Sequence, residues 1–297
     1  MTTDLYNKLT HNGLFTLGMD GSAFQVRDRK SAITWETAAL QGVKFVAWRA
    51  CVGGYYTDLS FVPNMLGARA AGIIHRLAYL VIRPDYTAAA HIDLFFAQLD
   101  ELARQEGAGH IPPLAVMDVE VKAASRLRQS LGQYFSPTSV NQRLQQVGAR
   151  IRDRYAGRNP ILYSNYDYIH SFMGSKADKE YLTEYDFWVA NYRTKFENSC
   201  SAAKPSVPAP FLDESMTLQG GKFWQFTADE NRLGAEFGAE SMAIDLNRTL
   251  LSAQQLDEYF GIAALSPQPE PQVPVPVNPE LQAALADMQA VVNQHTP

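Results

Sequence analysis

Eight short apolar runs along the first 250 residues are the feature that most constrains the fold of this chain. Amphipathic stretches or long loops separate most of them, and residues 87–106 and 138–155 show helical periodicity after a Thr or Ser cap. Strands that alternate with helices form parallel sheets, and eight such units close into a barrel. The sequence therefore predicts an α/β fold, a (β/α) TIM-like barrel of eight strands with an incomplete or irregular set of helices. The predicted strands are residues 14–20, 43–49, 73–82, 113–120, 160–165, 186–191, 222–227 and 242–246.

The composition changes after Leu265, which predicts three parts. Residues 1–265 are expected to form the barrel. Residues 266–279 carry six prolines and should be an extended, semi-rigid linker. Residues 280–297 are predicted to be a short helical tail with one apolar stripe, which should dock on a partner protein, on a second copy or on the barrel. The stripe consists of Leu281, Leu285, Met288 and Val292.

Charge and hydropathy exclude several classes of partner. The 297 residues carry a net charge of −5 without a basic block, which argues against a nucleic acid or an anionic membrane surface. No apolar stretch approaches the roughly 18 residues that a membrane span requires. Residues 1–13 lack the apolar segment of a signal peptide, so none is expected.

Cysteine and histidine usage predicts no metal centre and no cofactor. Cys51 and Cys200 are too few for a disulfide framework or a metal site. A disulfide between them stays open, but two free thiols fit the missing secretion signal better. The six histidines show no metal-binding spacing, and neither a glycine-rich phosphate loop nor a G-x-S-x-G motif occurs.

The run of residues 114–120 ends in two carboxylates, Asp118 and Glu120. Because strand side chains alternate between faces, these two point to the same side. Neighbouring carboxylates repel each other, so at least one pKa should be raised, as a general acid working near neutral pH requires. The spacing alone is weak support for catalysis, since most such pairs lie on the surface.

Polar and aromatic residues gather where the predicted strands end, and in a (β/α)8 barrel the active site lies there. Converging carboxylates and flat aromatic rings are typical of a carbohydrate-cleaving site. Each residue also has a structural explanation: the outer aspartates could cap turns, the tryptophans could pack in the core, and the arginine could form an ion pair. The candidates are Asp20, Arg49, Tyr79, Asp118, Glu120, Tyr163, Trp188, Asn191, Trp224, Gln225 and Asp245.

A series of short motifs spanning residues 18–248 resembles the glycoside hydrolase family 25 muramidases, the Chalaropsis-type lysozymes, and the motifs arrive in that family's order. Two departures are Leu80, where the family usually has His, and Gly21-Ser22 in the motif after the first aspartate. The motifs are G-M-D-G-S-A-F-Q (18–25), V-K-F-V-A-W-R-A (43–50), D-L-S-F-V-P-N (58–64), A-R-A-A-G-I (68–73), M-D-V-E (117–120), P-I-L-Y-S-N (160–165), F-W-V-A-N-Y (187–192), F-W-Q-F-T (223–227) and I-D-L-N-R (244–248).

The resemblance implies a peptidoglycan hydrolase that cleaves the β-1,4 bond between N-acetylmuramic acid and N-acetylglucosamine without a cofactor. Glu120 would be the general acid and later the base, and Asp118 would orient the substrate's N-acetyl group. Asp20 and Asp245 would surround Glu120 with negative charge. The substrate-binding residues would be Arg49, Tyr79, Tyr163, Trp188, Asn191, Trp224 and Gln225.

Two other functions are compatible with parts of the pattern. A chitinase-like barrel of family 18 also ends its fourth strand in Asp-x-Glu, but it places another Asp where this chain has Val116. A glycan-binding barrel that has lost activity is the non-enzymatic alternative. A muramidase acts on the cell wall outside the cytoplasm, and without a signal peptide we expect release by phage lysis, virion delivery or dedicated export.

Overall fold

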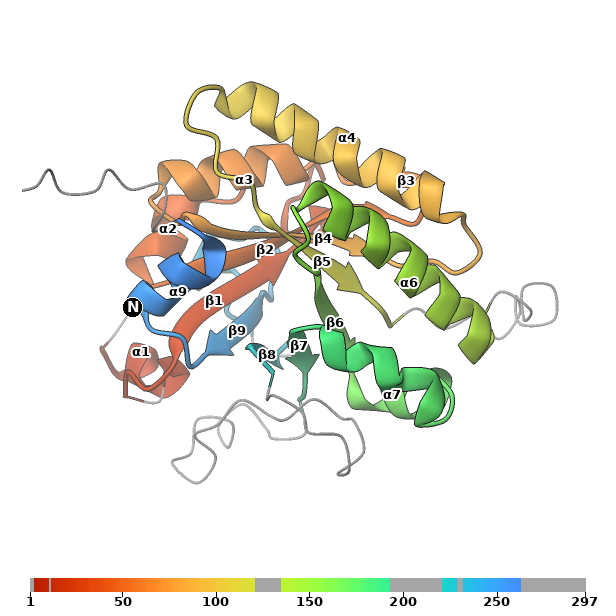
Figure 1. The fold of residues 1–297 in the computed structure, drawn as a ribbon. Helices are drawn as coiled ribbons and strands as arrows, with labels where there is room; N and C mark the ends of the chain where they lie inside the picture. The colour runs from red at the N-terminus through yellow and green to blue at the C-terminus, as the bar shows by residue number, and fades with distance from the viewer. Residues whose placement is uncertain (1–2, 11, 121–134, 193–220, 229–231, 263–297) are drawn as a thin grey trace, which may run out of the picture. The chain divides into compact units, whose positions relative to one another are not determined.

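The strands close into a barrel in the computed structural model, which describes residues 3–10, 12–120, 135–192, 221–228 and 232–262 (Figure 1). Around the barrel the order is β1-β9-β8-β7-β6-β5-β4-β2, and β2 returns to β1. The short β3 is added to β2 as a hairpin. The predicted TIM-like barrel is therefore confirmed. The strands are β1 (Thr16–Gly21), β2 (Phe45–Val52), β3 (Tyr56–Thr57), β4 (His75–Val81), β5 (Leu114–Asp118), β6 (Ile161–Asn165), β7 (Phe187–Ala190), β8 (Phe223–Thr227) and β9 (Asp245–Thr249).

One strand of the barrel runs against the others, so the prediction of a wholly parallel barrel is wrong for the last strand. β9 pairs antiparallel with both β8 and β1, whereas the other barrel strands pair in parallel. A parallel return needs a long crossover, usually a helix. Between β8 and β9 the described residues hold only the 3-10 helix η3 (Ala235–Phe237), and the chain turns back from the end it has just reached.

Long helices cover the outside of β2, β4 and β5, and two of them match the predicted helical stretches. Thr87 caps α4 by accepting a hydrogen bond from the amide of Ala90 at 3.1 Å, and Ser136 caps α6 through the amide of Ser139 at 3.2 Å. The helices on the β6–β7 side are short, as the prediction of an irregular set requires. The remaining elements are α1 (Thr3–Thr10), η1 (Ala23–Gln25), α2 (Trp35–Leu40), α3 (Phe61–Ala70), α4 (Ala88–Glu106), α6 (Pro137–Arg154), α7 (Tyr166–Phe172), η2 (Ala177–Glu184) and α9 (Ala253–Phe260).

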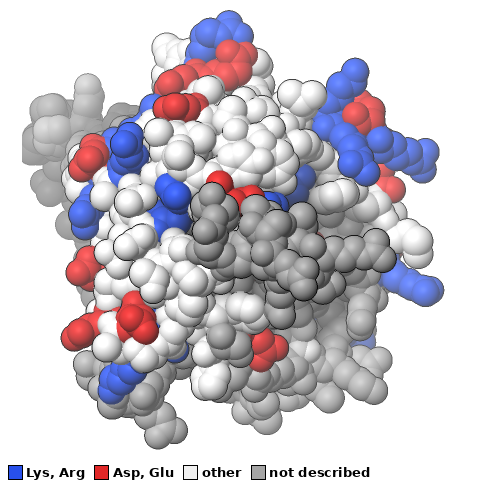
Figure 2. All heavy atoms as spheres, turned by 90° about the vertical axis from the view of Figure 1, so that its right-hand side faces the viewer, with Lys and Arg blue, Asp and Glu red and all other residues white. Residues whose placement is uncertain are grey.

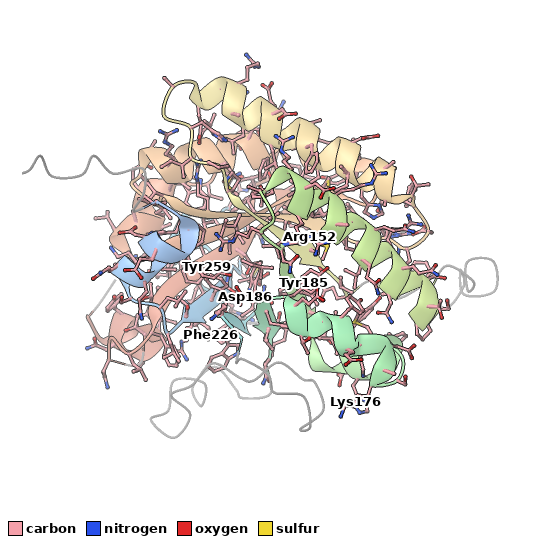
Figure 3. All side chains as sticks on the ribbon, in the orientation of Figure 1. Arg152, Lys176, Tyr185, Asp186, Phe226 and Tyr259 are labelled. Atoms are coloured by element: carbon pink, nitrogen blue, oxygen red, sulfur yellow. The ribbon has the colours of Figure 1, made fainter. Side chains whose placement is uncertain are left out.

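Side chains of the strands alternate between the helix-facing layer and the barrel interior. At the end where the parallel strands begin, the interior is filled by Phe45 and Phe223, whose ring centroids lie 5.1 Å apart. A Cβ atom at Gly18 would lie 2.3 Å from the ring of Phe45, so this position needs glycine. α9 covers the same end: the Tyr259 hydroxyl donates to Asp186 at 2.8 Å (Figure 3). The opposite end is left for polar residues.

The chain divides into two compact units, Met1–Phe260 and Gly261–Pro297. The predicted linker, residues 266–279, and the predicted tail, residues 280–297, lie outside the described residues. The same holds for Cys200, whereas Cys51 is a buried free thiol. None of the helices in the described ranges has the length and hydropathy needed to cross a membrane.

Candidate active site

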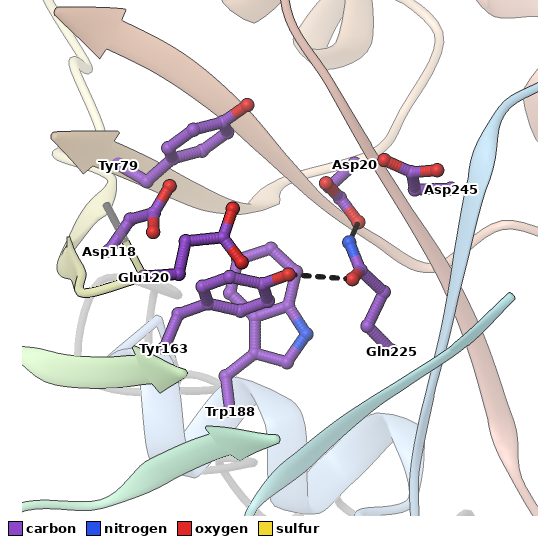
Figure 4. A pocket seen from close by; sticks show the side chains of 8 residues that line it. All are labelled: Asp20, Tyr79, Asp118, Glu120, Tyr163, Trp188, Gln225 and Asp245. Carbon is purple, nitrogen blue, oxygen red and sulfur yellow. Dashed lines mark hydrogen bonds between the residues drawn. The ribbon is translucent and has the colours of Figure 1, made fainter. Parts of the chain in front are cut away.

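A pocket opens at the end of the barrel where β1 and the other parallel strands finish and β9 begins (Figure 4). It encloses about 340 Å³ when its open mouth is included. Figure 2 shows the side of the molecule toward which β4 and β5 point in Figure 1, with acidic side chains near its centre. Eight of the predicted site residues line the pocket: Asp20, Tyr79, Asp118, Glu120, Tyr163, Trp188, Gln225 and Asp245.

Asp118 and Glu120 both reach the pocket from β5, as the alternation of a strand requires. β5 ends at Asp118, but strand-like hydrogen bonds continue: the amide of Val119 donates to the carbonyl of Tyr163 at 3.0 Å. Asp118 is buried, and Glu120 is exposed. The pair therefore offers one desolvated carboxylate and one that is open to a ligand.

The buried carboxylates hold their protons more tightly than free aspartates do. Burial raises the pKa of Asp118 well above its usual value, and the charges of Glu120 and Asp20 raise it further. Burial also raises the pKa of Asp20 to about 6, although hydrogen bonds from Asn247 and Gln225 act in the opposite direction. Within the Asp118–Glu120 pair, the expected rise in pKa is present at Asp118, with burial as its largest cause and the charge of Glu120 as the next.

Two buried amides hold Asp20 in place, and their orientation is fixed by aromatic donors. The Gln225 carbonyl oxygen accepts hydrogen bonds from the hydroxyls of Tyr163 (2.8 Å) and Tyr192, so its amide nitrogen faces Asp20 at 2.8 Å. Asn247 accepts from the indole of Trp188 at 2.7 Å and donates to the same Asp20 oxygen at 2.7 Å. One Asp20 oxygen therefore receives two N–H donors.

Asn247 is a site residue that the sequence reasoning missed. It is fully buried and lies two residues after Asp245 on β9, so both side chains belong to the inward face of the strand. That i, i+2 spacing is the signal that could have found it. Asp245 itself was predicted at the end of the eighth strand, whereas it stands at the beginning of β9 and reaches the same rim because β9 is reversed.

The aromatic side chains of the pocket use their polar tips within the protein. The Tyr79 hydroxyl donates to the carbonyl of Gly21 at 3.0 Å. Tyr163 and Trp188 meet edge to face with centroids 4.8 Å apart. With the tips fixed by these contacts, the rings form a rigid wall, which is the kind of surface on which a sugar ring packs.

Trp224 and Asn191 are not among the residues that line the pocket. Trp224 follows the outward face of β8 and packs in the helix-facing core against Phe15 and Phe226, with centroids at 6.3 and 5.9 Å. The substrate-binding role predicted for Trp224 does not fit that position. The Asn191 carbonyl accepts the Trp224 indole N–H at 3.1 Å, so its backbone helps to join β7 to β8.

Arg49 lies beside the pocket and is held there by an ion pair. Its Nε donates to Asp58 at 2.9 Å, and Asp58 also accepts hydrogen bonds from the amide of Ala23 and the hydroxyl of Ser60. This contact is the structural ion pair that the sequence offered as an alternative role for Arg49. Arg49 also lowers the pKa of Asp118, so its charge is felt within the pocket.

Among the described residues, no group of three or more His, Cys, Asp or Glu side chains is arranged to hold a metal ion. Burial raises the pKa of Cys51 to about 12. This thiol lies in the helix-facing core, away from the pocket.

Comparison with known proteins decides the family. The sequence model of glycosyl hydrolases family 25 matches residues 23–235. This protein belongs to glycosyl hydrolase family 25. It is therefore a glycoside hydrolase, and the predicted resemblance is confirmed. The matched range holds Asp118 and Glu120, whereas Asp20, Asp245 and Asn247 lie just outside it.

Solved structures share the fold of this family 25 enzyme at low sequence identity. A family 25 glycosyl hydrolase from Bacillus anthracis has a TM-score of 0.58 and 20% identity over 82% of this chain and 92% of its own. A bacterial lysozyme from Streptomyces coelicolor has a TM-score of 0.57 and 24% identity over 82% of this chain and 95% of its own. A muramidase from Trichobolus zukalii has a TM-score of 0.57 and 21% identity over 84% of this chain and 100% of its own. A search of curated proteins finds no match.

Proposed function

We propose that this family 25 enzyme is a peptidoglycan hydrolase, an N-acetylmuramidase that cleaves the β-1,4 bond between N-acetylmuramic acid and N-acetylglucosamine. Structures of the same fold are named lysozymes and muramidases. The observation that supports this proposal most strongly is that exposed Glu120 and buried Asp118 line the same pocket. A proton donor must reach the glycosidic oxygen, and Glu120 is the carboxylate of the pair that is open to a ligand.

Asp118 is suited to hold the acetamido group of the substrate. Its Oδ1 atom is buried and accepts no hydrogen bond from the described residues. A buried acceptor without a donor carries a free-energy cost that a ligand N–H group would remove. An acetamido group held there can place its carbonyl oxygen behind the sugar carbon that loses the leaving group. This substrate-assisted route is a known exception to catalysis by two carboxylates acting alone.

Glu120 would then serve twice. It first protonates the leaving glycosidic oxygen, and as a carboxylate it later takes a proton from the water that opens the cyclic intermediate. The intermediate and the transition states around it carry positive charge on the sugar ring. Asp20 and Asp245 add negative charge to the opposite wall of the pocket, which favours those cationic states (Figure 4).

The two alternative functions have less support. A chitinase-like site of family 18 would need a third acidic residue at position 116, where the chain has the fully buried, apolar Val116. A glycan-binding barrel without activity would not need four carboxylates around one pocket. Because peptidoglycan lies outside the cytoplasm, we also propose that the enzyme acts there, after phage lysis, virion delivery or dedicated export.

Digestion of purified cell walls tests the proposal. Wild-type protein should clear the suspension, and mass spectrometry after borohydride reduction should find muramic acid at the new reducing ends. Glu120→Gln should be inactive, and Glu258→Gln, which changes an exposed glutamate on α9, should match the wild type. Products that end in N-acetylglucosamine would refute the proposed bond, and binding without clearing would favour a lectin.

A further inference from the structure

Next to the pocket, two arginines converge on an exposed aromatic ring. Phe24, in η1, is 61% exposed, and the guanidinium carbons of Arg29 and Arg49 each lie 5.2 Å from its ring centroid. Arg49 also lies 5.4 Å from the ring centroid of Tyr56. These four residues, Phe24, Arg29, Arg49 and Tyr56, are called the Phe24 ledge below. An apolar ring at this degree of exposure, flanked by two cations, is a feature that folding alone does not require.

The Phe24 ledge adjoins the catalytic pocket. Arg49 on β2 is the register partner of Tyr79 on β4, and Tyr79 lines the pocket. The Tyr79 hydroxyl is bound by the carbonyl of Gly21, three residues before Phe24. A polymer lying across the mouth of the barrel would therefore pass from the pocket onto the ledge.

The positive charge of the ledge is only partly neutralised. Arg49 gives its Nε to Asp58, while its terminal nitrogens donate no hydrogen bond to any described residue. Arg29 is exposed and forms no ion pair within the described part of the chain. Its φ of 57° lies in the left-handed region, a strained conformation that tends to occur at functional sites. The nearby Asp28 carboxylate accepts hydrogen bonds from Lys30 and Ser31.

We propose that the Phe24 ledge is a binding subsite for a carboxylate-bearing sugar residue of the substrate, which rests on the proposed muramidase function. The sugar packs on the ring of Phe24, and the carboxylate accepts charge-assisted hydrogen bonds from Arg49 and Arg29. A planar guanidinium fork matches a carboxylate in two-point geometry. In a wall polymer this carboxylate belongs either to the lactyl group of a muramic acid without its peptide or to the stem peptide.

Three matched substrates separate these sources. They are glycan strands freed of peptides, the same strands with the lactyl carboxylates converted to neutral amides, and strands that keep their stem peptides. The wild type should show a lower KM for strands with free carboxylates than for the amidated strands, and added salt should reduce the difference. The substrate on which the variants below lose most identifies the carboxylate that is bound.

Arg29→Gln should raise KM on the preferred carboxylate substrate about two- to fivefold, as expected for an exposed charge pair. Arg49→Lys keeps the charge but loses the fork, and should raise KM about tenfold or more. In both variants the KM ratio between amidated and charged strands should fall toward one. A melting curve for Arg49→Lys within a few degrees of wild type shows that the substitution leaves the fold intact.

Arg158→Gln is the matched control, because Arg158 lies 4.7 Å from the ring centroid of Tyr259 at the other end of the barrel. It should leave every KM unchanged. The proposal is overturned if Arg29→Gln and Phe24→Ala leave the KM ratio as it is in the wild type. If the wild type cleaves none of the three substrates, the muramidase assignment fails instead, so the two failures are distinguishable.

Discussion

Asp20 and Asp245 are direct register partners across the antiparallel pair of β1 and β9. Two like charges at opposite positions of a strand pair destabilise it. At Asp20, burial raises the pKa, and the charge of Glu120 raises it further, to about 6. The mouth of the barrel therefore carries an electrostatic cost that a packed core would not require, and several predictions depend on that cost.

Asp20→Asn should make the protein more stable at neutral pH. A carboxylate whose pKa is higher in the folded than in the unfolded state binds protons more tightly when folded, so the stability it contributes is lost as pH rises. The rise from 3.8 to about 6 corresponds to about 3 kcal/mol once Asp20 is ionised. Thermal melts should show a clear gain for the variant at pH 7 and little or none below pH 4. An equal gain at both values would contradict the ionisation argument.

Glu120→Gln should abolish wall clearing while leaving the fold intact. The amide cannot donate a proton to the leaving oxygen, and loss of a general acid typically costs about 10²–10⁴-fold in rate. Because Glu120 is exposed, circular dichroism and the melting temperature should stay at wild-type values. Clearing within about threefold of the wild type would remove Glu120 from this role.

Asp118→Asn should lose most of the activity and shift the pH profile. The neutral amide cannot stabilise the positive charge of the intermediate. Removing one of the interacting carboxylates also lets the remaining site release its proton more easily, so the alkaline limb should move to lower pH. The measurement is the pH dependence of kcat/KM. A limb that stays in place, or moves to higher pH, would show that the two groups are not coupled.

Asn247→Leu should move the acid limb of the same profile to higher pH. The variant removes one N–H donor from Asp20, which raises the pKa of Asp20 further, and it leaves the indole of Trp188 without its acceptor. Asn141→Leu is a useful control because Asn141 is also buried but bonds the carbonyl of Met173 and the hydroxyl of Tyr181, outside the pocket. A change of the same size in both profiles would point to general destabilisation.

Deleting residues 266–297 should leave the barrel folded and active on soluble peptidoglycan fragments. A proline-rich linker carries few long-range contacts, and α9 ends at Phe260, before the deletion begins. Light scattering and thermal melting of the full-length and the truncated protein decide whether the tail self-associates or docks on the barrel. A drop in melting temperature above roughly 5 °C, equivalent to about 1–2 kcal/mol, would mean that the tail belongs to the barrel.

Much of the barrel could be predicted because each strand is a short apolar run and the two longest helices, α4 and α6, each have a side-chain cap. The direction of β9 could not, since a run such as residues 242–246 has no polarity of its own. Direction is set by the connection, and the short η3 between β8 and β9 replaces the crossover helix that a parallel strand would need. Asp245 was predicted to lie at the mouth of the barrel, and it does. It lies there because β9 is reversed, which the sequence does not show.

Within the candidate site, strict alternation would have improved the prediction. Trp224 and Gln225 are neighbours on one strand, so they cannot both point into the barrel. Gln225 points into the interior, and Trp224 points to the helix-facing core. The same rule links Asn247 to Asp245. The ion pair of Arg49 with Asp58 could not be predicted from pattern, because it joins a strand to the turn before α3 and depends on the tertiary fold.

The pairing of β1 with β9 also decides when the enzyme can become active. Thr16 pairs with Thr249, so barrel closure joins residues far apart in the sequence, and contacts of that kind form slowly. Asp20 comes from the first strand and Asp245 from the last. A chain still emerging from the ribosome can already carry Glu120 and Asp118, but it lacks a closed pocket until residues 245–249 are made. Hydrolytic competence therefore requires the chain at least as far as Thr249, the end of the strand that closes the pocket.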